Sequence, residues 1–334
     1  MSEPTTGRRP GPTDAHRPPR VVVGVDGSPG SRAALVYAFA AAARRGADLA
    51  VVSTYSVQTV WIGGWPLGVP AVATIRDEAE SRIVALVEEV RADGAVRAVP
   101  GTADVPAVVV VSGGPAAEVL VDASASADLV VVGSRGRGAV RSVVLGSVAL
   151  HCVTHARCPV VVVHPVLTGH TGARTVIVGI DGSATSRAAL LAGVIEAARS
   201  GTDVAAVTTY EPADPWMHLT TVAVPTADQV RAELQQGAES MLEDVLAEYR
   251  AGSGVAPDAR VVVTEGPAAD VLIRWAADAA LLVVGSRGHG EFRGLLVGSV
   301  ALACAMHASG PVLVVHPQPD RAPVEAAQRA TAGT

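Results

Sequence analysis

The stretch Val130-Val-Val-Gly-Ser-Arg-Gly-Arg-Gly-Ala-Val-Arg-Ser-Val-Val-Leu-Gly-Ser-Val148 decides the fold, and it returns almost unchanged from Leu282 to Val300. In both copies a β-branched run ends in a glycine, a second glycine follows after two residues, and Gly-Ser comes after nine more. These positions are Gly133, Gly136, Gly146 and Ser147 in the first copy and Gly285, Gly288, Gly298 and Ser299 in the second. A glycine loop between a buried strand and a helix is typical of a phosphate-binding site.

The loop has the chemistry that an anion requires. Glycines let the backbone approach a ligand closely and permit the turn that aims N–H groups inward. Gly146-Ser147 then opens a helix, whose free N–H groups and positive dipole end favour phosphate. The same glycines are compatible with a tight turn that binds nothing, with Ser147 as an ordinary N-cap. The repeated spacing favours phosphate binding, although the loop is neither a Walker motif nor G-x-G-x-x-G after a first strand.

A second motif shows that the repeat spans whole domains. Val21-Val-Val-Gly-Val-Asp-Gly-Ser28 matches Val176-Ile-Val-Gly-Ile-Asp-Gly-Ser183, and both continue to Ser-Arg-Ala-Ala-Leu. The repeat predicts two domains, residues 20–165 and 175–317, joined by a linker at 166–174. Residues 1–19 and 318–334 are predicted to be disordered tails, because they are rich in polar residues, Pro and Ala and lack apolar periodicity.

Each half alternates five apolar strands with helices, which predicts a parallel sheet with right-handed crossovers. Such sheets bind ligands at the carboxyl ends of their strands, where the strand order reverses. The glycine loop follows the fourth strand and Asp26 follows the first, so both are expected to face one crevice. The fifth strands, 160–163 and 312–315, are too apolar for exposed edges and are expected to cover each other.

Composition narrows the class of protein. Of 334 residues, 49% are hydrophobic, 17% charged and only 3% aromatic, which suits Val-, Ala- and Leu-rich parallel sheets. The net charge of -6 excludes a general attraction for nucleic acid or an anionic membrane. Three cysteines without C-x-x-C spacing and an N-terminus without an apolar segment favour a reduced, cytoplasmic location, and no segment has the length of a membrane span.

Several other side chains have more than one interpretation. The loop arginines could neutralise phosphate or keep an exposed loop solvated: Arg135, Arg137, Arg141, Arg287 and Arg293. Trp61 and Trp216 occupy matching positions and could be lids or plain loop anchors. His151 and His155 have the spacing of a helical metal pair, but the second copy has Ala303 and His307, which disfavours a metal. No catalytic constellation of Ser, His and Asp recurs.

The spacing G-x2-G-x9-G-[ST] resembles that of the ATP-binding members of the universal stress protein family, and the resemblance covers Arg20 to Pro317. It implies an α/β fold of two tandem Rossmann-like domains. Each would be a five-stranded parallel sheet, order 3-2-1-4-5, with helices on both faces, packed as a pseudo-dimer through strand five. By position, Asp26 and Asp181 would bind adenine, Val52 and Val207 would line its pocket, and the loop would hold ribose and phosphates.

The predicted nucleotide-binding residues are Gly24, Asp26, Val52, Val132, Gly133, Arg135, Gly136, Gly146, Ser147, Val148, Gly179, Asp181, Val207, Val284, Gly285, Arg287, Gly288, Gly298, Ser299 and Val300. The resemblance implies ATP with Mg²⁺, one nucleotide per domain, in a cytoplasmic stress-response binding protein that is not primarily an enzyme. Its expected partners are an adenine nucleotide, its own second domain and a further copy in a homodimer. Two alternatives stay open: a slow adenine-nucleotide hydrolase or transferase using the same sites, and an interaction protein with empty sites.

Overall fold

The computed structural model describes residues 18–55, 72–136, 145–165, 175–211, 226–288 and 297–317, together with the backbone of 61–62 and 65–66. The predicted linker 166–174 and the predicted tails lie outside these ranges, apart from residues 18 and 19. Five candidate side chains also lie outside them: Trp61, Arg137, Arg141, Trp216 and Arg293.

The described elements of the first half alternate as predicted. In chain order they are β1 (Arg20–Gly24), α1 (Pro29–Arg45), β2 (Asp48–Tyr55), β3 (Trp61–Ile62), β4 (Trp65–Pro66), α2 (Val72–Ala92), α3 (Gly94–Arg97), the 3₁₀ helix η1 (Thr102–Asp104), β5 (Ala107–Gly113), α4 (Ala116–Ser124), β6 (Leu129–Gly133), α5 (Ser147–His155) and β7 (Val160–Val163). The two-residue strands β3 and β4 pair with each other between β2 and α2.

The described second half repeats this order with fewer short elements. It contains β8 (Thr175–Gly179), α6 (Ala184–Ser200), β9 (Asp203–Tyr210), α7 (Ala227–Ser253), β10 (Ala259–Glu265), α8 (Ala268–Ala276), β11 (Leu281–Gly285), α9 (Ser299–His307) and β12 (Val312–Val315).

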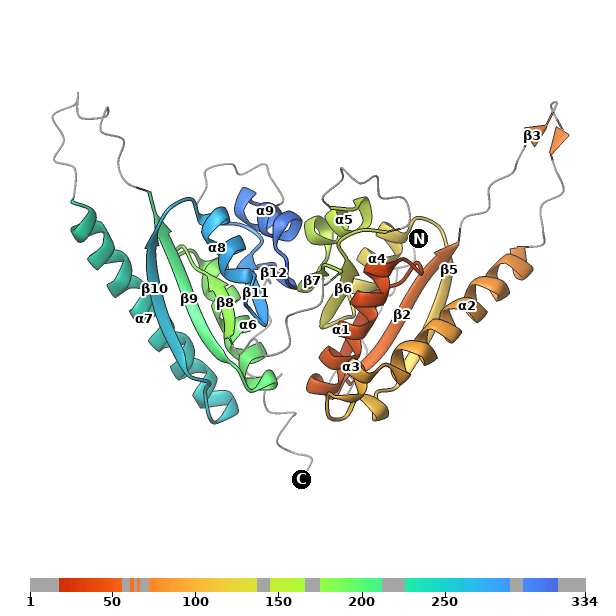
Figure 1. Cartoon of the computed structure of the whole chain (residues 1–334), viewed down its shortest axis with the longest axis horizontal. Coiled ribbons are helices and arrows are strands. Elements are labelled where there is room, and N and C mark those ends of the chain that lie inside the picture. The colour runs from red at the N-terminus through yellow and green to blue at the C-terminus, as the bar shows by residue number, and fades with distance from the viewer. Residues whose placement is uncertain are drawn as a thin grey trace, which may run out of the picture.

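All strands except β3 and β4 form one ten-stranded sheet, in the order β10-β9-β8-β11-β12-β7-β6-β1-β2-β5. Strands within each half are parallel, whereas β7 and β12 are antiparallel. Each half therefore has the predicted order 3-2-1-4-5, and the two fifth strands pair at the centre of the molecule (Figure 1). The prediction that the halves pack through strand five is confirmed.

Two helix layers cover the sheet, and each layer has a core that runs across both halves. One core lies under α1, α2, α6 and α7 and includes Phe39 and Leu190; the other lies under α4, α5, α8 and α9 and includes Leu120 and Leu272. Both cores are mainly Val, Ala and Leu. Helices α5 and α9 lie on the upper side of Figure 1, on either side of the central strand pair β7 and β12.

Local chemistry explains where the first helix of each half begins. The Ser28 side chain accepts a hydrogen bond from the N–H of Ser31, and Pro29 occupies the first helical position of α1. Ser183 caps α6 in the same way. The preceding turn requires glycine, because Gly27 has a φ of 79° and Gly182 a φ of 88°. These turns carry the chain from β1 and β8 past the candidate sites.

Candidate functional site

The carboxyl ends of β1 and β6 bring Asp26 and the glycine loop together. β1 and β6 are neighbours in parallel register, with Val21 opposite Leu129. A Cβ built on Gly136 would lie 2.7 Å from Asp26 Oδ2. In the second half, a Cβ on Gly288 would likewise meet Asp181 Oδ2. The strand order reverses between these strands, so the paired features sit where open parallel sheets bind ligands.

The two carboxylates also organise the turns that carry them. Asp26 Oδ1 accepts a hydrogen bond from the Ser28 N–H at 2.9 Å, and Asp181 Oδ1 accepts one from the Ser183 N–H at 3.0 Å. Asp26 is partly buried and Asp181 is exposed. One oxygen of each carboxylate therefore holds the turn while the other faces the loop glycine. A role in the turn and the predicted role in adenine binding are therefore compatible for each aspartate.

Packing within the protein restricts two of the predicted glycines in the first half, Gly133 against backbone and Gly24 only against the end of a side chain. A Cβ on Gly133 would lie 2.6 Å from both the carbonyl carbon and the oxygen of Gly30, and a Cβ on Gly24 would lie 2.7 Å from Leu120 Cδ1. In the second half, a Cβ on Gly285 would lie 2.9 Å from Thr185 Cγ2 and 3.2 Å from Thr185 O, a milder restriction than that on Gly133, and a Cβ on Gly179 would lie 2.7 Å from Leu272 Cδ1. These strand-end glycines allow helices to approach the sheet, whether or not a ligand is present.

Gly146 and Gly298 are different, because no contact within the described chain demands glycine there. Their φ values are -70° and -74°, which any residue adopts. A Cβ on Gly146 would come no nearer than 3.5 Å to its closest described neighbour, Ser134 O, and a Cβ on Gly298 no nearer than 3.6 Å to Ser286 O. Neither the backbone angles nor the described neighbours therefore require glycine at these two positions.

These glycines also leave the starts of α5 and α9 without a capping side chain among the described residues. Gly146, rather than Ser147, is the N-cap of α5, so the alternative in which Ser147 caps the helix is wrong. Ser147 and Ser299 are exposed at the first helical position. Among the described residues, no side chain caps the first N–H groups of α5 and α9, and a helix start of this kind can bind an anion.

The remaining predicted residues surround the loop with different exposures. Arg135 and Arg287 are exposed, as a residue that meets phosphate from solvent would be. The four strand valines are almost fully buried in the core beneath α4, α5, α8 and α9: Val52 at 5%, Val132 at 2%, Val207 at 1% and Val284 at 3% exposure. Val148 and Val300 are partly buried against that core. All six valines therefore belong to that core or pack against it, and their role in a nucleotide site stays a prediction.

Each loop also contains a buried serine that the sequence analysis does not predict as a site residue. Ser134 and Ser286 are fully buried, and neither hydroxyl has a hydrogen-bond partner among the described residues. Their backbones hold the loop at both sides: Ser134 N–H donates to Val163 O at 2.8 Å, and Ser134 O accepts from the Gly146 N–H at 2.8 Å. The shared Gly-Ser-Arg-Gly sequence was the available signal.

Two histidines, also missed, link each strand end to the opposite half. His164 Nδ1 donates to Gly310 O at 3.2 Å, and His316 Nε2 donates to Val153 O, within α5, at 2.7 Å. The other ring nitrogen of each is buried without a partner among the described residues. Burial lowers the pKa of both imidazoles, partly offset by the carbonyl contacts, and nearby Arg135 and Arg287 lower it further.

The lowered histidine pKa values predict acid sensitivity of the domain pair. The folded chain resists protonation below the ordinary value of 6.5, so the unfolded chain binds protons first as the pH falls. The free energy of unfolding should then decrease below pH 6.5, by up to about 1.4 kcal/mol per histidine for each unit of lowering. When the pH is lowered from 7.5 to 5.5, the melting temperature of the double variant His164→Gln/His316→Gln should decrease less than that of the unmodified protein. The exposed His307→Gln is the control, and an unchanged loss in the double variant would contradict the assignment.

The metal interpretation gains no support from the described residues. The rings of His151 and His155 stack with centroids 4.2 Å apart, and His155 Nδ1 donates to His151 O. Within the described ranges, no group of three or more His, Cys, Asp or Glu side chains is placed to hold a metal ion. The pair is a stacked feature of the α5 surface.

Comparison with known proteins gives the family. Two stretches, residues 19–164 and 172–316, each match the universal stress protein family, and together they cover most of the chain. The chain belongs to this family, as a tandem member. Universal stress protein Rv2005c of Mycobacterium tuberculosis is 35% identical over 297 residues, which is 88% of this chain and 96% of that protein. Members of the family are generally regulatory proteins.

Solved structures support the fold of this universal stress protein. One from Archaeoglobus fulgidus DSM 4304 covers 89% of this chain and 98% of its own, with 18% identity and a TM-score of 0.62. A universal stress protein in complex with cAMP is 30% identical over 43% of this chain and 97% of its own, with a TM-score of 0.32, too low to transfer a ligand. Among the described helices, none combines the length and apolarity needed to cross a membrane.

Proposed function

We propose that this universal stress protein is a cytoplasmic regulatory protein that binds one adenine nucleotide in each domain, with ATP and Mg²⁺ as its ligand. The phosphates would lie against the N-terminus of α5 or α9, within the glycine loop. The adenine would lie toward Asp26 or Asp181. Nucleotide binding would then be the input of a stress response, with the bound state read by other proteins.

The observation that carries the proposal is the glycine at the start of α5 and α9. Gly146 and Gly298 have ordinary backbone angles and room for a Cβ, yet both are glycine and both leave the helix without a side-chain cap among the described residues. A hydroxyl cap would stabilise the helix, as Ser28 and Ser183 do elsewhere. A ligand phosphate that takes the place of the cap accounts for both glycines.

The site chemistry supports binding rather than turnover. The carboxylate facing each loop, Asp26 or Asp181, also accepts a hydrogen bond from the N–H of its own turn. A general base must be within reach of the attacking water. The described residues beside the loop offer no further carboxylate or imidazole in contact with Gly136 or Gly288, and Mg²⁺ would be held mainly by the phosphates. The proposal therefore predicts tight binding with negligible turnover.

A competition experiment tests the proposed ligand class. A fluorescent ATP analogue bound to nucleotide-free protein would be displaced by ATP, ADP, AMP, cAMP and GTP in parallel, with and without Mg²⁺. We expect adenine nucleotides to displace the analogue at concentrations at least about tenfold lower than GTP does. This corresponds to a difference of about 1.4 kcal/mol in binding free energy. Equal displacement by GTP would contradict adenine recognition. Phosphate release with a steady-state rate well above background would favour the hydrolase alternative.

A further inference from the structure

The seam between the two halves is the antiparallel pair of β7 and β12, and each half contributes nearly the same strand to it. β7 is Val-Val-Val-Val and β12 is Val-Leu-Val-Val, and they pair antiparallel about Val161 and Leu313. Two copies of β7 could pair by the same hydrogen bonds and nearly the same side chains. The strands alone therefore do not distinguish the pairing of a first half with a second half from the pairing of two first halves.

The histidine contacts do not distinguish these pairings either. His164 and His316 occupy equivalent positions, and both bond to main-chain carbonyl oxygens, of Gly310 and Val153. Every half offers main-chain carbonyls at the corresponding places. Two like halves could make both contacts. Selectivity must come from side chains that differ between the halves.

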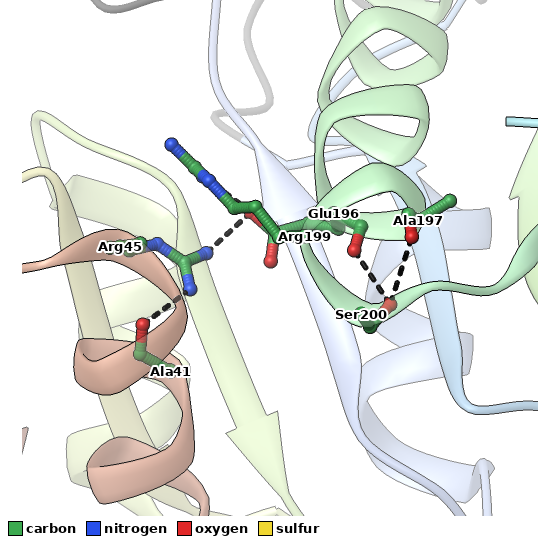
Figure 2. Close-up of polar contacts among 6 residues, drawn as sticks. All are labelled: Ala41, Arg45, Glu196, Ala197, Arg199 and Ser200. Carbon is green, nitrogen blue, oxygen red and sulfur yellow. Dashed lines mark hydrogen bonds and ion pairs between the residues drawn. The ribbon is translucent and has the colours of Figure 1, made fainter. Parts of the chain in front are cut away.

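Such side chains lie where the ends of α1 and α6 contact each other across the seam. Arg45 Nη2 is 2.5 Å from Glu196 Oε1, and Arg199 Nη1 is 3.0 Å from the same oxygen. Only 6% of the Arg45 side chain and 11% of the Glu196 side chain are exposed. Figure 2 shows Arg45 reaching from its own helix, where it also donates to Ala41 O, toward Arg199 and Glu196.

The cluster of Arg45, Glu196 and Arg199 is not repeated with the two halves exchanged. The first strands and first helices of the two halves are 155 residues apart, which makes Ser200 the counterpart of Arg45 and Ala41 the counterpart of Glu196. Ser200 instead donates to Glu196 O and Ala197 O within α6 (Figure 2). The Arg45 ion pair can form only when a first half meets a second half.

We propose that Arg45 and Glu196 select the partner of the seam: the face of the first half fits a universal stress protein domain with a carboxylate at the Glu196 position and rejects a second copy of itself. In a pair of two first halves, each Arg45 would face Ala41 of the other copy. Two guanidinium groups would then be buried with alanine in place of their acid. Breaking a buried ion pair by removing one partner is strongly unfavourable, because the remaining charge stays desolvated.

A charge-swap cycle in the intact chain tests the coupling. Arg45→Glu and Glu196→Arg should each lower the melting temperature by at least about 5 °C. The double variant Arg45→Glu/Glu196→Arg should recover most of the loss, because the glutamate introduced on α1 would lie between the arginine introduced on α6 and the native Arg199. Arg44→Glu, an exposed reversal of the same charge one residue away, is the matched control and should change little. Additive losses in the double variant would overturn the proposal.

A second experiment tests the selection itself. A protease site in the linker 166–174 would let the folded chain be cut into paired halves, for both the unmodified and the charge-swapped protein. After the two cut proteins are mixed and exchange is complete, native mass spectrometry would show which halves pair. We expect each first half to pair with a second half that carries the opposite charge at position 196. Unmodified halves would then pair with unmodified halves, and charge-swapped halves with charge-swapped halves. Random reassortment, or pairs of two first halves in the unmodified protein, would overturn the proposal.

Discussion

Replacing Gly136 with aspartate is expected to abolish nucleotide binding in the first domain and leave the second domain's site intact. The new Cβ would lie 2.7 Å from Asp26 Oδ2, so the added carboxylate would be forced beside an existing one at the mouth of the loop. It would occupy the space proposed for phosphate and repel it. We expect affinity to fall at least about 100-fold, or roughly 2.7 kcal/mol, at that site.

The second repeat provides an internal check on this result. Gly288→Asp should remove the other site, and the double variant should bind no nucleotide. Gly237→Asp, on the exposed face of α7 with no described heavy atom within 4 Å of its Cβ position, adds the same charge without touching either loop. Isothermal titration of the four proteins should give one, one, zero and two nucleotides per chain. Unchanged binding in Gly136→Asp would show that the phosphates lie elsewhere.

Replacing Gly133 with alanine is expected to destabilise the fold even without nucleotide. Its Cβ would lie 2.6 Å from backbone atoms of Gly30, at the start of α1, which a side-chain rotation cannot relieve. The helix would have to move away from β6, at a cost of about 3 kcal/mol. A chemical denaturation curve of the nucleotide-free protein measures the loss.

Gly94→Ala is the matched control for this substitution. Gly94 is exposed at the start of α3, and no described heavy atom lies within 4 Å of its Cβ position. The control should be as stable as the unmodified protein or slightly more stable. If Gly133→Ala were equally stable but bound nucleotide poorly, its glycine would be explained by the ligand and not by helix packing.

The repeating part of the fold could be predicted from local patterns. Apolar strands, the Asp-Gly-Ser-Pro turn and the glycine loop are short-range signals, and the family resemblance supplied the strand order. The apolar run at 105–111 predicts the third strand two residues too early, because β5 is Ala107–Gly113. The 3₁₀ turn at Thr102–Asp104 and Pro106 delay pairing, because Pro106 has no N–H to donate to a ladder.

The long-range contacts that require a particular residue type at one position could not be predicted in the same way. The restriction on Gly133 comes from Gly30, about a hundred residues away, and sequence shows only that both are glycine. The ion pair of Arg45 with Glu196 joins residues 151 apart and exists because the repeat is imperfect there. The sequence places His164 only at the end of a strand, although its ring contacts the other half. Such contacts depend on how the halves are arranged in space.

Each domain is expected to hold one adenine nucleotide, and the number of ATP molecules bound per chain tests this most directly. Nucleotide-free, full-length protein would be titrated with ATP and Mg²⁺ by isothermal calorimetry, with protein concentration fixed by amino-acid analysis. We predict a stoichiometry of two per chain. A stoichiometry of one would contradict the assignment of a site to each domain, and no binding would contradict the nucleotide site itself.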